Sequence, residues 1–209
     1  LAGSVSFVSF GLLLIVAFFS YSQIQVLLIL CILGGLGGFL VFNMPWKGRA
    51  RASIFMGDAG STLLGFLLAY LLISLSQGHG SDEQRGMAPV VALWIFAVPL
   101  GVMVRRIWMK RSPFAADRGH IHHLFLDAGF RVRQAVLLIA FLQLVMGAIG
   151  LAGYYLGVPD MLSLLAFMMI FTGYIYLISR PWRIVPHFRT LHQRSGLTVR
   201  GVQHVYVGN

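Results

Sequence analysis

Six apolar stretches, each long enough or nearly long enough to cross a bilayer, alternate with polar segments along this chain of 209 residues. A membrane-crossing helix needs about 20 mostly apolar residues. The pattern predicts an all-α, polytopic membrane protein with about six transmembrane helices, and Pro99 is expected to kink the fourth. The predicted crossings are roughly residues 5–20, 24–42, 59–76, 89–104, 135–157 and 161–179.

Basic residues fix the expected orientation of these crossings. All but one of the 16 Lys and Arg residues lie in segments 43–57, 105–134 and 180–209, which alternate with crossings as cytoplasmic loops do. The loop 77–88 carries only Arg85, offset by Asp82 and Glu83. We therefore expect cytoplasmic N and C termini, with a transmembrane helical domain at 1–179 and a basic cytoplasmic tail at 180–209.

The amino-acid composition excludes some classes of protein. With 58% hydrophobic and 11% charged residues, the chain would expose too much apolar surface to be a water-soluble domain. The net charge of +10 lies in short loops between crossings, which favours membrane lipids and an anionic substrate as partners rather than nucleic acid. Cys31 is the single cysteine and lies in an apolar run, so no disulfide framework is expected.

The first candidate site lies where the third crossing opens, around Gly57-Asp58-Ala59-Gly60-Ser61. Asp58 stands where a helix N-cap would stand, and a capping role alone would explain it. A carboxylate at the interface can also hold Mg²⁺ while the metal bridges phosphate oxygens. Taken alone, this segment favours the cap.

The second candidate site is the loop that contains Asp117, Arg118, His120, His122 and His123. A solvated headgroup-binding patch is one interpretation, and a zinc site is another, although the spacing lacks the H-E-x-x-H pattern. Recognition of a diphosphate by His and Arg donors is the third. Because Asp58 and Lys47 are expected on the same membrane face, the third interpretation is favoured.

These residues together resemble the polyprenyl-phosphate N-acetylhexosamine-1-phosphate transferases (glycosyltransferase family 4), and within that family the bacterial undecaprenyl-phosphate N-acetylglucosamine-1-phosphate transferases. The similarity runs from Leu1 to about Arg183. The matching motifs are Phe55-Met56-Gly57-Asp58-Ala59-Gly60-Ser61, Arg105-Arg106, Ser112-Pro113-Phe114, Asp117-Arg118 and His120-Ile121-His122-His123.

The resemblance implies a reaction that depends on Mg²⁺, or on Mn²⁺ as the alternative ion, at the cytoplasmic face of the bacterial inner membrane. Undecaprenyl phosphate would attack the β-phosphorus of a UDP-sugar, release UMP and start a lipid-linked surface glycan such as the O-antigen of lipopolysaccharide. A homodimer is compatible with the resemblance. The implied roles are metal binding for Asp58, uracil stacking for Phe55, diphosphate or sugar contacts for Arg106, His120, His122 and His123, and substrate binding for Lys47, Asp117 and Arg118.

Two departures from the family pattern bear on activity. Leu1-Ala2-Gly3-Ser4 resembles the end of a motif that follows further helices in the family, so we expect that this chain lacks those helices and is inactive alone. The family also usually carries an acidic residue and a few more positions after Pro99-Leu100, where this chain has Gly101. A gap of about one helical turn would shift Arg106 by about 6 Å along the helix axis.

Two other function classes stay open from the residues. A transport or scaffold module with headgroup-binding loops is the main alternative, but the crossings offer few polar groups beyond Gln143 and scattered Ser, Thr and Tyr. An intramembrane zinc hydrolase would need a metal-bound water and a nearby general base.

Overall fold

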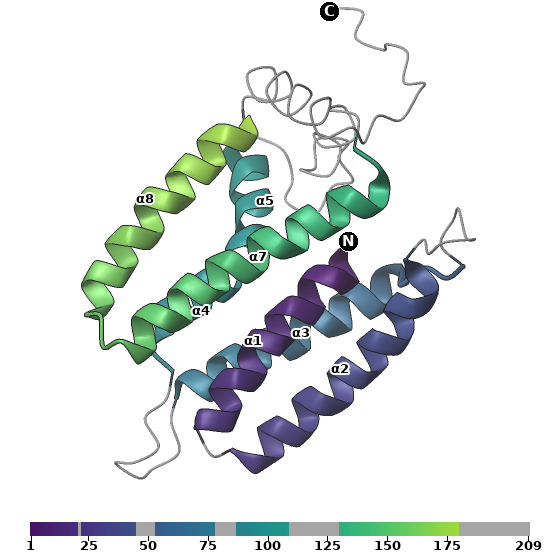
Figure 1. The fold of residues 1–209 in the computed structure, drawn as a ribbon, viewed down its shortest axis with the longest axis horizontal. Coiled ribbons are helices and arrows are strands. Elements are labelled where there is room, and N and C mark those ends of the chain that lie inside the picture. Colours follow the sequence, from purple (N-terminus) through teal and green to yellow (C-terminus); the bar gives the residue numbers. More distant parts are fainter. Residues whose placement is uncertain (21, 45–52, 78–86, 109–129, 180–209) are drawn as a thin grey trace, which may run out of the picture.

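The computed structural model describes the chain except residues 21, 45–52, 78–86, 109–129 and 180–209. The regular structure of the described residues is all helical, which confirms the predicted fold class (Figure 1). The predicted tail at 180–209 lies outside the described residues. The helices are α1 (Ala2–Phe19), α2 (Gln23–Asn43), α3 (Gly57–Ser76), α4 (Pro89–Ile95), α5 (Ala97–Trp108), α7 (Val132–Tyr155) and α8 (Asp160–Ser179).

Within the described residues, five helices are long and apolar enough to cross a membrane: α1, α2, α3, α7 and α8. Their outward faces carry large apolar side chains such as Leu27, Phe66 and Met169, which are 64%, 67% and 73% exposed. Lipid tails are the environment in which such side chains are stable. The chain is a multi-pass membrane protein, as the apolar pattern predicts.

The fourth predicted crossing differs from the expectation of one helix kinked at Pro99. It consists of two short helices, α4 with 7 residues and α5 with 12, and the break falls at Phe96. The second of these helices continues past the predicted end at 104 as far as Trp108. Side chains from neighbouring helices bridge the break: Gln143 of α7 and Ser9 of α1 both bond to the carbonyl oxygen of Ile95.

The interior is organised around α1 and α7, which pack against each other. On one side α1 also packs against α2 and α3, and on the other side α7 packs against α4 and α5, with α8 beyond them (Figure 1). The buried centre contains Phe10, Leu13, Ile29, Leu71 and Ile95, none of which is exposed. This order of contacts places α3 and α5 in different halves of the bundle.

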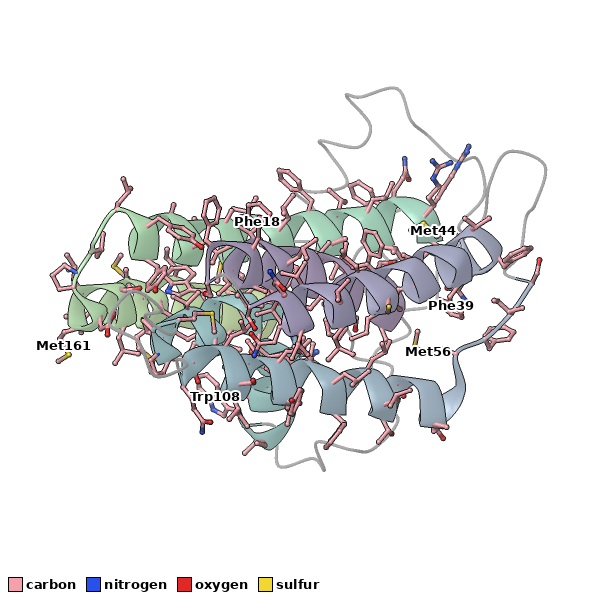
Figure 2. The ribbon with its side chains drawn as sticks, turned by 90° about the horizontal axis from the view of Figure 1, so that it is seen from below. Phe18, Phe39, Met44, Met56, Trp108 and Met161 are labelled. Carbon is pink, nitrogen blue, oxygen red and sulfur yellow. The ribbon has the colours of Figure 1, made fainter. Side chains whose placement is uncertain are left out.

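The bundle has two ends with different chemistry. At the end that we call the basic end, α1, α3 and α7 begin and α2, α5 and α8 finish (Figure 1). Arg105, Arg131 and Arg133 lie there. Figure 2 shows Met44 and Met56 at this end and Met161 at the opposite one. The alternation of helix directions agrees with the predicted loop assignment, while the side of the membrane stays a prediction.

Candidate active site at the basic end

The candidate metal ligand Asp58 lies in the first turn of α3 and is exposed at the basic end. The expectation that it caps the helix is wrong: the N-cap residue is Met56, and no side chain caps this helix. Gly57 explains the difference, because its φ of +66° lets the chain turn at this residue, so that the N-cap falls two residues before Asp58. The carboxylate is therefore left beside the first exposed N–H groups of α3, where the helix dipole favours negative charge.

The segment before α3 is fixed to the end of α2. The side-chain Nδ2 of Asn43 donates to the carbonyl of Ile54 at 2.7 Å, and the backbone N–H of Ser53 donates to the carbonyl of Phe42 at 3.0 Å. These two bonds tie residues 53 and 54 to the last turn of α2. The residues that lead into α3 are therefore anchored at the end of α2.

Met56 and Gly3 connect the same segment to the start of α1. A Cβ atom at Gly3 would lie 3.2 Å from Cε of Met56 and 3.1 Å from Cε1 of Phe39, so the three helices meet closely here. Figure 2 shows Phe39 and Met56 approaching one another at this end. Asp58 thus stands on a supported corner formed by α1, α2 and α3.

Phe55, the candidate uracil-stacking residue, precedes Asp58 by three residues and is 87% exposed. A large aromatic side chain this exposed has one ring face available to a planar partner. The stacking role of Phe55 stays a prediction.

The candidate residue Arg106 lies in the last turn of α5, beside Arg105. The upstream residue Gly101 packs directly on Tyr174 of α8: a Cβ atom at this position would overlap the ring, with 3.0 Å to Cδ1 and 3.2 Å to Cζ. Any side chain at position 101 would therefore require the Tyr174 ring to shift. Whether Arg106 is displaced along the axis stays a prediction.

The structure places Asp58 and Arg106 at the same end of the bundle without bringing their helices together. The close packing between them runs from α3 through α1 and α7 to α5. The remaining candidate residues, Lys47, Asp117, Arg118, His120, His122 and His123, lie outside the described residues. The expected convergence of the two motifs on one pocket therefore stays a prediction.

The described residues can be compared with the needs of Mg²⁺. They contain no group of three His, Cys, Asp or Glu that could enclose a metal ion. Mg²⁺ in phosphoryl-transfer sites is instead bound through one or two carboxylates together with substrate phosphates. Asp58 provides one exposed carboxylate at a helix N-terminus, which fits a Mg²⁺ site that substrate phosphates complete.

The sequence pattern does not assign a structural role to the two residues that bridge the α4–α5 break, Gln143 and Ser9. Gln143 and Ser9 are fully buried; Gln143 bonds to α5, the helix that carries Arg106, and Ser9 bonds to Gln143 and to the end of α4. The sequence feature that could have indicated this role is a single glutamine in the middle of one apolar crossing, together with Pro99 in another.

Comparison with known proteins gives one family match and several named relatives, all of them transferases. Residues 1–76 match the model of the family described as glycosyl transferase family 4. Three curated relatives, all named undecaprenyl-phosphate alpha-N-acetylglucosaminyl 1-phosphate transferase, come from Pasteurella multocida (strain Pm70), Escherichia coli (strain K12) and Yersinia pestis. They are 38%, 36% and 37% identical over 92%, 93% and 93% of this chain.

The chain spans about half the length of these relatives, since the matched region covers 53% of each. No solved structure matches the chain.

Proposed function

We propose that this chain, whose residues 1–76 match the model of glycosyl transferase family 4, is part of an enzyme that transfers a sugar 1-phosphate from a UDP-sugar to undecaprenyl phosphate. The observation that carries the proposal is the similarity over 92–93% of the chain to transferases with that acceptor in their name. Their name also favours N-acetylglucosamine as the sugar. The product would start a lipid-linked surface glycan in the bacterial cytoplasmic membrane.

The proposed reaction is a phosphoryl transfer. An oxygen of undecaprenyl phosphate attacks the β-phosphorus of the UDP-sugar, a new phosphorus–oxygen bond forms, and the bond to the α-phosphate bridging oxygen breaks to release UMP. Such transfers rely mainly on positioning and on neutralising phosphate charge. A site at the end of a helix bundle suits this pair of substrates, because one is dissolved in water and the other is anchored in the membrane.

The described residues can do two parts of this work. Asp58 and the exposed N–H groups at the start of α3 form a polar corner at the interface, with the helix dipole directed toward phosphate. Phe55 offers an exposed aromatic face for uracil beside that corner. When bound at Asp58, Mg²⁺ would neutralise charge on the phosphate oxygens.

The other roles rest on the family resemblance. Arg106, His120, His122 and His123 would contact the diphosphate or the sugar, and Lys47, Asp117 and Arg118 would bind substrate. The matched region covers only 53% of the Pasteurella multocida relative, so nearly half of that transferase has no counterpart in this chain. This chain alone would then be inactive.

The test is a fusion of this chain behind the amino-terminal part of the Escherichia coli relative, which we call the completed transferase. Membranes that contain it are given UDP-GlcNAc, undecaprenyl phosphate and Mg²⁺, and the release of UMP is measured. We expect release by the completed transferase and none by the chain alone. No UDP-dependent turnover in either protein would contradict the proposal and favour a transport or scaffold role.

Asp58→Asn in the completed transferase tests the site itself. We expect UMP release to fall at least about 10²-fold, as when a charge-stabilising group is removed from an active site. The matched control is Asp160→Asn, because Asp160 occupies the first turn of α8 at the opposite end of the bundle. A wild-type rate in Asp58→Asn, or equal losses in both variants, would remove Asp58 from the mechanism.

A further inference from the structure

The break between α4 and α5 leaves specific backbone groups without their usual helical partners. In a continuous α-helix the N–H of residue 99 would donate to the carbonyl of residue 95, and the N–H of residue 98 to the carbonyl of residue 94. Pro99 has no N–H, and the chain departs from the helix at Phe96. Inside a membrane, water cannot replace the missing partners, and each unsatisfied group is costly.

Gln143 replaces both of the missing bonds with one side chain. Its Nε2 donates to the carbonyl of Ile95, and its Oε1 accepts from the N–H of Val98 at 3.2 Å. Ser9 of α1 adds a bond from its Oγ to the same carbonyl at 3.3 Å. The amide of Gln143 therefore stands on both sides of the break, one group bonded to the end of α4 and the other to the start of α5.

The geometry points to Gln143 as a positioning residue that sets the direction in which α5 leaves α4. The residues that depend on this direction, Arg105 and Arg106, lie about nine residues beyond the break, or about 13 Å along the helix. A change of about 20° at the break would displace them by about 4 Å. Displacements of about 1 Å in an active site can cost about 10²-fold in rate.

A role as a ligand or ion-path residue fits the same side chain poorly. Gln143 is fully buried, and its oxygen and nitrogen are both engaged by protein groups. The inference rests on the proposed function only in its claim about catalysis. The claim that Gln143 compensates for Pro99 stands on the break in the helix and on the hydrogen bonds that Gln143 makes there.

The experiment is a double-mutant cycle of Gln143→Leu and Pro99→Ala in the completed transferase, with thermal stability in detergent and steady-state UMP release as readouts. Gln143→Leu should lower the melting temperature and reduce kcat about 10²-fold, with a much smaller change in KM for UDP-GlcNAc. Pro99→Ala restores the N–H that the carbonyl of Ile95 lacks. The double variant should therefore regain the melting temperature while kcat stays low, because the straightened helix directs α5 elsewhere.

The matched control is Gln25→Leu. Gln25 is also buried and donates from Nε2 to Oγ of Ser74 at 2.6 Å, but it bridges two continuous helices. We expect this variant to lose stability with an unchanged kcat and no recovery from Pro99→Ala.

Two outcomes would overturn the inference: a melting temperature of Gln143→Leu that Pro99→Ala does not raise, or a double variant that recovers kcat as well as stability. If the unsubstituted completed transferase releases no UMP, the proposed function fails instead. The stability arm of the cycle would still decide whether Gln143 compensates for Pro99.

Discussion

Gly150 marks a close approach of α7 to α4 that a single methyl group should disrupt. A Cβ atom at this position would lie 2.5 Å from Cγ and 2.9 Å from Cδ1 of Trp94, and closer still to Cβ of Trp94. Carbon atoms pack without repulsion at about 3.5–4.0 Å. Since the Cβ of Trp94 is fixed to the backbone of α4, a change of rotamer cannot relieve the overlap. The two helices would have to separate by about 1 Å.

The energetic consequence can be separated from the general effect of replacing glycine in a helix. Overpacking of this kind costs about 1–3 kcal/mol. Glycine-to-alanine substitution in a helix interior contributes about 0.5–1 kcal/mol in the opposite direction. Gly153→Ala on the same helix provides the control, because its Cβ would meet Val158 at an ordinary 3.9 Å. The helix-propensity effect cancels in the comparison, so Gly150→Ala should be about 1–3 kcal/mol less stable than Gly153→Ala.

The assay is equilibrium unfolding of the two variants in mixed micelles of a mild detergent and SDS, followed by far-UV circular dichroism. Adding Trp94→Ala to Gly150→Ala should give little recovery, because alanine keeps the Cβ atom that makes the shortest contact. Equal stability of the two glycine variants would refute the close approach of α4 and α7. So would a full recovery by Trp94→Ala, which would place the overlap on the ring alone.

Three further predictions follow from other parts of the molecule. Gly57→Ala should destabilise the start of α3 by about 1–2 kcal/mol, because Gly57 has a φ of +66°; unchanged unfolding in mixed micelles would contradict that conformation. Ser163→Ala should cost about 0.5–1.5 kcal/mol by removing the acceptor of the Trp94 indole N–H at 3.2 Å, whereas Ser163→Thr, which keeps a hydroxyl, should cost less. In a Cys31→Ser background, Asp82→Cys should react with a charged, membrane-impermeant maleimide added to intact cells, and labelling only after cell lysis would reverse the predicted topology.

The existence of most helices could be predicted because it depends on a local property. Length and apolar content alone place a crossing, and the expected bounds agree with α2, α3 and α8 to within about two residues. The fifth crossing was expected a few residues late, at 135–157 against Val132–Tyr155. Its first turn contains Arg133 and Gln134, which the apolar pattern excludes but the helix includes.

The break in the fourth crossing could be predicted only in part. Pro99 shows that a carbonyl one turn earlier will lack its helical partner, but not where the backbone turns. The turn falls at Phe96, next to the carbonyl of Ile95, which bonds to Gln143 and Ser9. Those partners are 48 and 86 residues away along the chain, so no local pattern contains them.

The candidate site could also be predicted only in part. Its residue types and motif order are visible in the sequence, and so is the location of Asp58 at the start of a helix. Taken alone, the segment nevertheless favours Asp58 as the N-cap, because a capping preference describes an average helix start. The actual start depends on the left-handed backbone of Gly57 and on the packing of Met56 near Gly3. Such tertiary contacts can override a local preference of about 1 kcal/mol.

The interior polar groups also bear on the choice between an enzyme and a transporter. A transport path would need polar groups near the midplane that are free to exchange partners with a solute. In the described bundle, Ser9 and Gln143 are bonded to each other and to the α4–α5 break, and the indole of Trp94 is bonded to Ser163. Their hydrogen bonds hold helices together, so a solute would have to break the packing to reach them. The exposed carboxylate of Asp58 can meet a ligand without that cost, which supports the proposal that the chemistry lies at the end of the bundle.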